Sequence, residues 1–576
     1  MIFFLPSGSS VEELASAGFS PGLMSAGLGD VPAAQTYYDI GQGNRVFDSL
    51  YDEDLPAGIV GAADRVALEV CDFAVPAAVA ERAESAPADI KPGLLGRTLE
   101  GWRVESCRVS KGSLREAARL RNELTPGDLL IAIESPPPAD GEPLAIGIAG
   151  RRFDGNLTSD STRLDGYVLS TDIAPTILER LALPVPEEMS GGAIRAEGSV
   201  DPVAIEALGE RMAAIPDRRG PVIGIALLVW LVALGLVTIL GVGAARVGVR
   251  LVGLSVVYLP LVLLLAAALE PSRGAEQLSA TIGPPLLALL TLRILVGYRA
   301  LTVAAGATTC ACAIDVIAGS PLTTLSLLGP NPGLGVRFYG IGNELEAILA
   351  VLVVAGTGAF LTGFAPRLSR GRAAIVFLVA GLLGAAVFGA GRFGADVGAA
   401  IVLPFGAAVA AAALAARRRP AIVLALAAPA LALALLALGD LASGGNAHLT
   451  RSVLDAGGLG EAAQVAQRRL ELSAHSFTRP VVFVFMPLVV AAAVLAFLGR
   501  LRIDSWLVGL PAMRAGLIGA LAAIVAGVLA NDSGALLLEI GAAYLLVFVG
   551  YAWAESGPKS RPPGSPEAAA GRSTTL

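Results

Sequence analysis

Hydrophobic and polar positions follow two different patterns along this chain. In roughly the first 219 residues, charges recur throughout and apolar runs are short: IFFLP near residue 2, DLLIAIES from Asp128 and PLAIGIAG from Pro143. Short apolar runs of this kind predict buried strands. Between them, Ser10 and Glu13 have the spacing of a capping box, and TDIAPTILERLAL from Thr171 has the pattern of a helix. Alternating strands and helices favour a doubly wound layer, so we predict a water-soluble α/β domain over residues 1–219.

From Pro221 the pattern changes to repeated apolar stretches of close to twenty residues, the length needed to cross about 30 Å of hydrocarbon. We therefore predict an all-α membrane domain of about eleven transmembrane helices over residues 220–556. The expected spans lie near 221–243, 251–269, 279–297, 300–318, 344–364, 373–390, 397–416, 420–439, 480–499, 512–530 and 534–553. Residues 557–576 are rich in Pro, Gly, Ser and Arg, which predicts a disordered tail.

Composition agrees with a polytopic membrane protein. Of the 576 residues, 54% are hydrophobic and only 16% are charged, whereas soluble proteins carry about 25% charged residues. The 42 basic and 49 acidic residues give a net charge of -7, so no nucleic-acid partner is expected. Only three basic residues are Lys, and Ala and Gly are abundant, which is typical of a GC-rich bacterial genome. We expect a bacterial cytoplasmic membrane as the location.

The arginine content of the short loops predicts the orientation. Every loop that follows an odd-numbered span carries Arg, for example Arg246, Arg299 and Arg370. This places those loops and the C-terminal tail in the cytoplasm and the N-terminal domain outside. Arg218 and Arg219, just before the first span, weakly oppose this orientation. No signal-peptide pattern is visible, so we expect that the true start lies upstream or that export relies on the first span.

Nine residues of the N-terminal domain follow the pattern D-hydrophobic-A-P-T-hydrophobic-L…P…M-x-G. They are Asp172, Ala174, Pro175, Thr176, Leu178, Pro184, Pro186, Met189 and Gly191. This run resembles the C-terminal part of alkaline phosphatase superfamily domains, the group that includes sulfatases and phosphodiesterases, where it follows the last catalytic ligands. The resemblance covers residues 120–200 well and the rest of the domain loosely. It implies an alkaline-phosphatase-like fold.

The catalytic half of that family's pattern is missing. Its enzymes hold two metal ions with Asp and His ligands and attack with Ser, Thr or a modified Cys. This domain has no His; its first strand continues into Pro6-Ser7-Gly8, and Glu134-Ser135 stands where the family has Asp-His. We therefore expect no metal, no cofactor and no phosphatase activity, and interpret the domain as a degenerate relative that binds or scaffolds. Asp172 is interpreted as a helix cap.

Cysteine usage adds little to this picture. The chain has four Cys, at positions 71, 107, 310 and 312. They are too few and too scattered for a disulfide framework or a thiolate metal site. Whether Cys71 and Cys107 pair is left open.

Three Gly-containing segments of the membrane half are predicted to share the outer side: GVRFYGIGNELEA from Gly335, GAGRFGADVGA from Gly389 and ANDSGA from Ala530. Glycine lets the backbone leave helical geometry, and a following helix N-terminus favours an anion. Guanidinium groups suit phosphate or carboxylate, and short outer loops usually avoid Arg. We therefore predict an anion-binding vestibule. Its substrate-binding candidates are Arg337, Asn343, Glu344, Arg392, Asn531 and Asp532, with Asp396 converging on the same cavity. The acids of these segments, Glu344, Glu346, Asp396 and Asp532, are costly near hydrocarbon and are therefore functional candidates.

Structural alternatives exist for most of these residues. Arg392 can pair with Asp396 four residues later, Arg337 can reach lipid headgroups, and Asp532 can cap the last span. Two further acids, Asp315 and Glu539, fall within predicted spans. Acids in spans mark proton relays or pairs across helices, and both alternatives stay open here.

The longest predicted loop of the membrane half, about residues 440–479, also lies outside and holds both histidines, His448 and His475. This layout is similar to that of polytopic glycosyl-polymer ligases and polymerases, which act on polyprenyl-pyrophosphate-linked donors. In an enzyme of that kind, His448, His475 or Asp396 would be the general base, and the two arginines of the vestibule would hold the pyrophosphate. The histidine spacing does not form a zinc site, and the alternative is an amphipathic interfacial helix over residues 460–472.

These observations lead to three hypotheses. The first is a cell-envelope membrane protein that recognises an anionic, lipid-linked phosphate or glycopolymer at its outer face, as a transferase in its enzymatic form. The second is a membrane transporter or flippase with interrupted helices and a proton-coupling acid. The third is a non-catalytic envelope scaffold with a pseudo-phosphatase domain. Membrane lipid, a polyprenyl-phosphate-linked substrate and envelope-assembly proteins are the expected partners.

Overall fold

The computed structural model divides the described chain into two compact units. The first comprises Met1–Pro221, Leu264–Pro271 and Asp315–Gly342, and the second comprises Val222–Leu263, Ser272–Ile314 and Asn343–Leu576. Two segments of the predicted membrane half thus belong to the N-terminal unit. The residues described are all except 28–30, 46–66, 68–69, 72–76, 78, 82–90, 92, 103–106, 138–141, 335–336, 416–417, 443–466, 468–469, 481 and 557–576.

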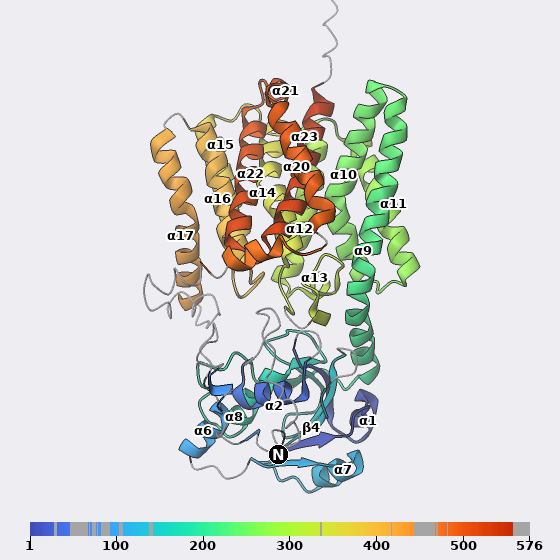
Figure 1. Ribbon diagram of the computed structural model, residues 1–576, viewed down its shortest axis with the longest axis vertical. Helices are drawn as coiled ribbons and strands as arrows, with labels where there is room; N and C mark the ends of the chain where they lie inside the picture. The colour runs from blue at the N-terminus through green and yellow to red at the C-terminus, as the bar shows by residue number, and fades with distance from the viewer. Residues whose placement is uncertain are drawn as a thin grey trace, which may run out of the picture. The chain divides into compact units, whose positions relative to one another are not determined.

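A six-stranded mixed sheet lies at the centre of the first unit (Figure 1), in the order β3-β1-β4-β5-β2-β7. β1 pairs in parallel with β3 and β4, β5 is antiparallel to β4 and β2, and β7 is parallel to β2. The apolar runs expected to be strands form β1, β4 and β5, so that prediction is confirmed. The strand bounds are β1 Ile2–Leu5, β2 Ser20–Ser25, β3 Val109–Lys111, β4 Leu129–Glu134, β5 Leu144–Gly150 and β7 Tyr167–Leu169; β6 Asn156–Thr158 pairs separately with β8 Arg195–Glu197.

Helices cover both faces of this sheet because alternate residues of each strand point to opposite sides. Ile2 and Phe4 enter one apolar core together with residues of α2, α6 and α8. Phe3 and Leu5 enter the other core, with residues of α1, α7 and the start of α9. The expected capping box of Ser10 and Glu13 is present at α1. The helix bounds are α1 Val11–Ser16, α2 Ala33–Gln42, α6 Leu94–Gly101, α7 Leu114–Asn122, α8 Ile173–Arg180 and α9 Pro202–Ile239.

The two loop segments of the first unit are held by arginines of α9. Arg211 donates to the carbonyl oxygen of Leu325 at 2.8 Å. Arg218 donates to that of Pro271 at 3.0 Å, and Arg219 to that of Gly329 at 2.7 Å. Arg218 and Arg219 oppose the charge pattern of the other loops, and these bonds give them a structural role that does not depend on orientation.

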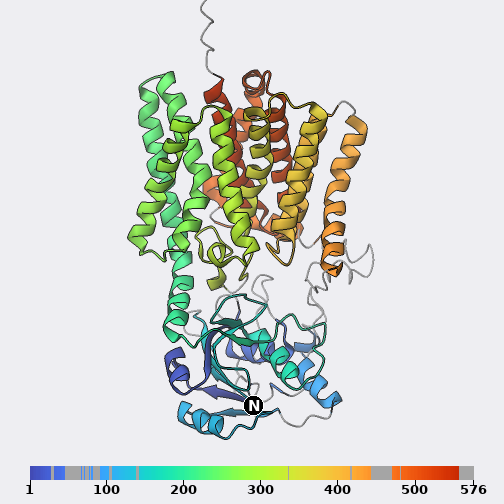
Figure 2. The same ribbon diagram turned by 180° about the vertical axis from the view of Figure 1, so that it is seen from behind.

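The second unit is a bundle of apolar helices (Figures 1 and 2). Among the described residues, nine helices are long and apolar enough to cross a membrane, and the bent pair α20–α21 makes up to ten. Nine of the eleven predicted spans coincide with the nine long helices. The other two fall on α17, whose described apolar part is the shorter stretch Ala425–Leu438, and on α20, which meets α21 at a bend of 72°. The bounds are α10 Val242–Ala267, α11 Arg273–Ile294, α12 Tyr298–Ile317, α14 Asn343–Gly363, α15 Arg370–Gly384, α16 Val397–Leu414, α17 Arg418–Ala442, α20 Val482–Leu498, α21 Arg500–Trp506, α22 Pro511–Ala530 and α23 Gly534–Glu555; the short α13, Pro321–Leu325, belongs to the first unit.

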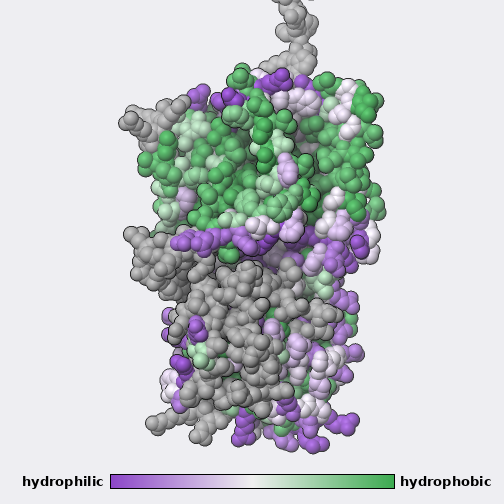
Figure 3. Space-filling model, viewed as in Figure 1, coloured by the Kyte–Doolittle hydropathy of each residue, from purple (hydrophilic) through white to green (hydrophobic). Residues whose placement is uncertain are grey.

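The outer surface of this helical unit is apolar. Figure 3 shows hydrophobic residues over the visible face of its helices, and large side chains such as Leu286, Leu426 and Leu495 are exposed. A soluble protein rarely exposes so broad an apolar surface. The chain is therefore a multi-pass membrane protein.

Glycines line the contacts among α14, α16 and α22. A Cβ on Gly516 of α22 would lie 3.1 Å from the Cα of Gly358 on α14. A Cβ on Gly406 of α16 would lie 2.8 Å from the carbonyl oxygen of Gly519 on α22. Small residues let membrane helices approach to backbone contact. These three helices consequently form the closely packed centre of the unit.

Candidate functional site

A buried polar pair joins α14 to the end of α22. Asn531, the residue after α22, donates from Nδ2 to Oε2 of Glu346 at 2.5 Å. Glu346 is only 2% exposed and Asn531 is 8% exposed. Glu346 lies in the first turn of α14, on a helix that is long and apolar enough to span a membrane. Burying a carboxylate in such a helix is costly, which makes the pair a functional candidate.

The first turn of α16 closes over the same carboxylate. A Cβ on Gly398 would lie 2.5 Å from Oε1 of Glu346, so any larger residue at this position would displace the Glu346 carboxylate. Two residues earlier, Asp396 is 2% exposed and its Oδ1 accepts a hydrogen bond from the backbone N–H of Ala399 at 2.8 Å. Asp396 is therefore the N-cap of α16. Two carboxylates thus lie at the start of α16, one on its cap and one facing its first turn.

The backbone leading into α16 is irregular. α15 continues as a π-helix over Ala385–Gly389, and the chain then folds back, with the N–H of Asp396 donating to the carbonyl oxygen of Phe388 at 3.1 Å. Ala395 adopts a φ of 51°, in the left-handed region. π-helical turns are frequent at functional sites. The Gly-rich segment expected from the sequence is therefore an interruption between two helices.

Further polar contacts lie at the break between α22 and α23. Asn343 Nδ2 donates to Oδ1 of Asp532 at 3.3 Å, which joins the start of α14 to the turn between α22 and α23. Ser473 Oγ donates to the carbonyl oxygen of Val528 at 2.6 Å. Ser476 Oγ accepts from the N–H of Ala535 at 3.0 Å. We call the set Asn343, Glu346, Asp396, Asn531 and Asp532 the helix-end cluster.

Four of the predicted site residues therefore lie in one cluster: Asn343, Asp396, Asn531 and Asp532. Glu344 is partly exposed in the first turn of α14. Arg392 is exposed on the segment before Asp396, with its guanidinium carbon 5.7 Å from the centre of the Phe393 ring. Asp532 is exposed. Its side chain accepts a hydrogen bond from Asn343, and the N-cap of α23 is Ser533, without a side-chain cap bond.

Arg337 belongs to the first unit, and the helix-end cluster belongs to the second. Its Nη1 donates to the carbonyl oxygen of Ile341. The next residue, Phe338, is 4% exposed and joins the apolar core of the first unit, with its ring centre 5.8 Å from that of Tyr167. Arg163 lies over the ring of Tyr339 at 3.7 Å. The aromatic residues of this segment thus anchor it to the N-terminal unit.

The remaining predicted residues lie outside the cluster or outside the described chain. His448 is not among the described residues, and His475 is exposed. Asp315 is 6% exposed, and its carboxylate accepts from the N–H groups of Leu322 at 3.0 Å and Thr323 at 2.7 Å. Asp315 is thus held by backbone donors at the start of α13. Glu539 is partly buried in α23, and its Oε1 has no hydrogen-bond partner among the described residues.

Asp172 in the first unit has a different role from the one predicted. It stands at the N-cap position of α8 but makes no side-chain cap bond there. Its fully buried carboxylate instead accepts hydrogen bonds from Ser159 at 2.7 Å, Ser161 at 2.6 Å, and the N–H groups of Leu169 and Gly192, both at 2.9 Å. Burial raises the pKa of Asp172, and these four bonds oppose the rise. The prediction of a cap on this helix was wrong because none of the four donors belongs to α8: Leu169 lies three residues before Asp172, and the other donors lie 11 to 20 residues away in the chain.

Other residues of the phosphatase-like motif also serve the fold. A Cβ on Gly191 would collide with the carbonyl oxygen of Thr171. Thr176 Oγ1 donates to the carbonyl oxygen of Asp172 at 2.6 Å and accepts from the N–H of Ile194 at 2.8 Å. At the end of β4, Glu134 accepts from the N–H groups of Gly8 at 2.6 Å and Ala145 at 3.1 Å. These contacts give Asp172, Thr176, Gly191 and Glu134 structural roles.

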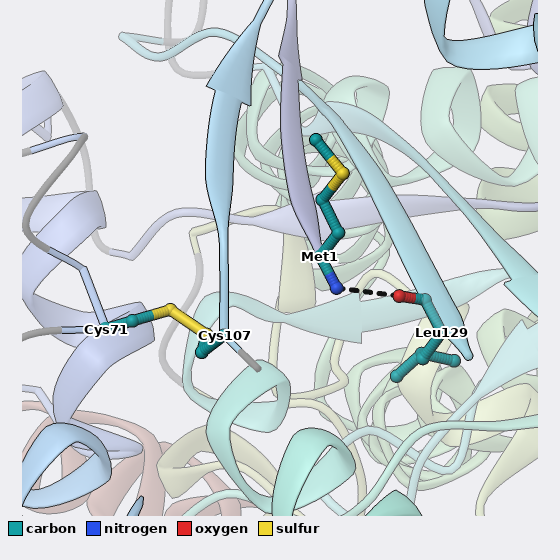
Figure 4. The surroundings of a disulfide bond; sticks show 4 residues. All are labelled: Met1, Cys71, Cys107 and Leu129. Carbon is teal, nitrogen blue, oxygen red and sulfur yellow. Dashed lines mark hydrogen bonds between the residues drawn. A yellow bond between two sulfur atoms is a disulfide. The ribbon is translucent and has the colours of Figure 1, made fainter. Parts of the chain in front are cut away.

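A disulfide bond links two segments of the first unit (Figure 4). Cys71 and Cys107 are joined over a sequence separation of 36 residues. This answers the pairing that the sequence left open. Figure 4 also shows the N-terminal amino group of Met1, at the start of β1, donating to the carbonyl oxygen of Leu129 at 2.7 Å.

Comparisons with known proteins give no assignment. No family model matches the chain, and neither a curated protein nor a solved structure matches it significantly. Within the described residues, no group of three or more His, Cys, Asp or Glu is placed to hold a metal ion. The sequence suggested Asn343, Asp396, Asn531 and Asp532, and it flagged Glu346 only as one of several acids. It did not single out Gly398 or Ser473, because their contacts, with Glu346 and Val528 respectively, are with helices distant in sequence.

Proposed function

We propose that this protein is a membrane transporter, a class that includes flippases, and that the helix-end cluster binds its substrate or its coupling proton. The observation that carries the proposal is Glu346, a carboxylate that is 2% exposed inside the membrane unit and is contacted by Asn531 and by the first turn of α16. Acids in this position mark proton relays and substrate pathways.

The backbone around the cluster supports the same proposal. Transporters bind substrates where membrane helices are interrupted, since exposed backbone groups at those breaks contact the ligand. Here α15 ends in a π-helix and α16 begins at the buried Asp396. The break between α22 and α23 supplies Asn531, which bonds Glu346. Two interruptions therefore meet at one buried carboxylate.

A second candidate function is recognition of an anionic, lipid-linked phosphate or glycopolymer at the outer face. Arg392 favours it, because this exposed guanidinium stands on the Gly-rich segment that leads into Asp396. In a transferase, Asp396, His475 or His448 would act as general base. The helix-end cluster itself is acidic and amidic, so we rank this function second.

The N-terminal unit completes the proposal. We infer that it is a degenerate relative of the alkaline phosphatase superfamily that gathers substrate or binds envelope-assembly proteins on the outer side of a bacterial cytoplasmic membrane. The disulfide between Cys71 and Cys107 supports an oxidising location. The structural roles of Asp172 and Glu134 support a non-catalytic domain. A protein that only scaffolds is the third candidate.

The test uses the full chain in proteoliposomes. Wild type, Glu346→Gln and Asp504→Asn are compared; Asp504 is an exposed acid that pairs with Arg514 and serves as the matched control. One assay follows proton flux with an internal pH dye while sugars, amino acids and inorganic phosphate are added in turn. The other follows translocation of a fluorescent polyprenyl phosphate by dithionite quenching.

We expect wild type and Asp504→Asn to carry at least one probe, and Glu346→Gln to carry it at least tenfold more slowly. Unchanged transport by Glu346→Gln contradicts the proposal. If no probe moves, native mass spectrometry decides between the other candidates. A polyprenyl phosphate that co-purifies with wild type and is lost from Arg392→Ala supports recognition of a lipid-linked anion, and only bulk phospholipid in both supports a scaffold.

A further inference from the structure

Arginine and aromatic side chains gather at the opposite ends of α10, α12 and α23, away from the helix-end cluster. Arg246 and Arg250 lie one turn apart in α10, and the guanidinium carbon of Arg246 lies 5.3 Å from the ring centre of Trp553. Arg250 Nη1 contacts Oε1 of Glu555 at 3.3 Å. Trp553 and Glu555 belong to the last turn of α23. Two cations and one anion therefore stand together here.

The residues at the start of α12 pack against the same group. Tyr551 of α23 donates from its hydroxyl to the carbonyl oxygen of Gly297 at 3.1 Å, and its ring centre lies 6.2 Å from that of Tyr298. A Cβ on Gly297 would lie 3.6 Å from Oε2 of Glu555. Tyr298 is thus adjacent to the Arg250–Glu555 pair.

Two hydrogen-bond donors in this group lack an acceptor in the part of the chain that the structure describes. The hydroxyl of Tyr298 and Nη1 of Arg246 are both buried atoms, and neither has a hydrogen-bond partner among the described residues. Tyr298 as a whole is 9% exposed. A buried donor without a partner costs free energy, more so when it is charged. An arginine that only anchors the helix at the interface would keep its guanidinium in water, whereas this nitrogen is buried.

We propose that Arg246, Arg250, Tyr298 and Trp553 form a binding site for the phosphate group of an anionic phospholipid. With Arg250 paired to Glu555, Arg246 leaves one net positive charge, which matches the single negative charge of a phosphodiester. Arginine suits phosphate oxygens, and Trp is favoured at the depth of lipid headgroups. Basic pockets between membrane helices bind anionic headgroups by these same interactions. The predicted orientation puts this end in the cytoplasm.

The experiment is a lipid titration of the delipidated full chain followed by native mass spectrometry. The probes are phosphatidylglycerol, phosphatidylcholine and inorganic phosphate. The variants are Arg246→Gln and Tyr298→Phe, and the matched control is Arg500→Gln, an exposed arginine held over Phe497 at 4.4 Å. Thermal unfolding is measured for each variant without added lipid.

We expect one phosphatidylglycerol to bind more tightly than phosphatidylcholine, and each of the two variants to weaken it about tenfold, the loss of one charge-assisted hydrogen bond. Tyr298→Phe removes only an unpartnered oxygen, so its thermal stability without lipid should equal or exceed that of wild type, which keeps the test valid if Arg246→Gln fails to fold. Equal affinities in wild type and Tyr298→Phe, or an equal loss in Arg500→Gln, overturn the proposal. Displacement of the lipid by millimolar inorganic phosphate assigns the site to soluble phosphate and also overturns it.

Discussion

Replacing Asp172 by Ala should strongly destabilise the N-terminal unit. The change removes the acceptor of four hydrogen bonds. Gly192 N–H retains a second acceptor, since it also donates to Ser161 Oγ at 2.8 Å. The hydroxyl of Ser159, which is 1% exposed, and the N–H of Leu169 lose the acceptor that the structure gives them. At about 1–3 kcal/mol for each orphaned donor, the opening free energy should fall by about 2–6 kcal/mol.

Hydrogen exchange of the full chain measures this fall directly, because protected amides of β1 and β4 report the opening of the unit. A loss of about 2 kcal/mol accelerates their exchange about 30-fold. The matched control is Asp160→Ala on the neighbouring loop; Asp160 bonds Arg195 at 2.8 Å, and its side chain is 80% exposed. Exposed pairs contribute about 0–1 kcal/mol. Unchanged protection in Asp172→Ala, or the same loss in both variants, would refute the assignment of Asp172 as the organising residue of these loops.

Three further predictions follow from other parts of the structure. Replacing Cys71 and Cys107 by Ser should lower the stability of the first unit by about 4 kcal/mol on the chain-entropy model for a separation of 36 residues. The same hydrogen-exchange experiment measures this fall, and adding a thiol reductant should have no further effect on the variant. Gly519→Leu should lower the thermal stability of the purified protein because a Cβ there meets the carbonyl oxygen of Gly406, whereas Gly235→Leu, with nothing within 4 Å of its Cβ position, should not. Two acids should give opposite pH dependences. Burial raises the pKa of Asp172 above its usual 3.8, so its contribution to stability is lost as pH rises through the raised value, and Asp172→Asn removes that slope. The hydrogen bond from Arg195 lowers the pKa of Asp160, so its contribution is lost as pH falls through the lowered value; equal slopes in Asp160→Asn and wild type near pH 3 would contradict this.

Local patterns predicted much of the fold. The runs that became β1, β4 and β5 were recognisable because strands buried on both faces are apolar without interruption. The capping box at α1 needs only Ser10 and Glu13, which are three residues apart. β2 escaped prediction because its sequence, SPGLMS, has neither alternation nor a β-branched residue. The nine long helices were predictable because a helix that crosses the hydrocarbon core needs about twenty consecutive apolar residues, and stretches of that length are visible in the sequence.

The candidate site was predictable only in part. Asn343, Asp396, Asn531 and Asp532 were visible as polar residues at the ends of apolar stretches. The importance of Glu346 and Gly398 depends on the distance between α14 and α16, which no local pattern contains. Phe338 stands in one of the segments from which the vestibule was predicted, whereas its side chain lies in the core of the first unit. Nothing near it in sequence indicates that contact.

The glycine contacts among α14, α16 and α22 have a mechanical consequence. Backbone in direct contact with backbone leaves no long side chains whose rotamers can absorb sliding, so these three helices move as one body. If the proposed transport takes place, the unit has to open along the boundary of that body, where neighbouring helices meet it. Glu346 belongs to α14 and Asn531 directly follows α22, so the two residues stay together through such a motion. The segment that precedes α16 is the part that can change its conformation.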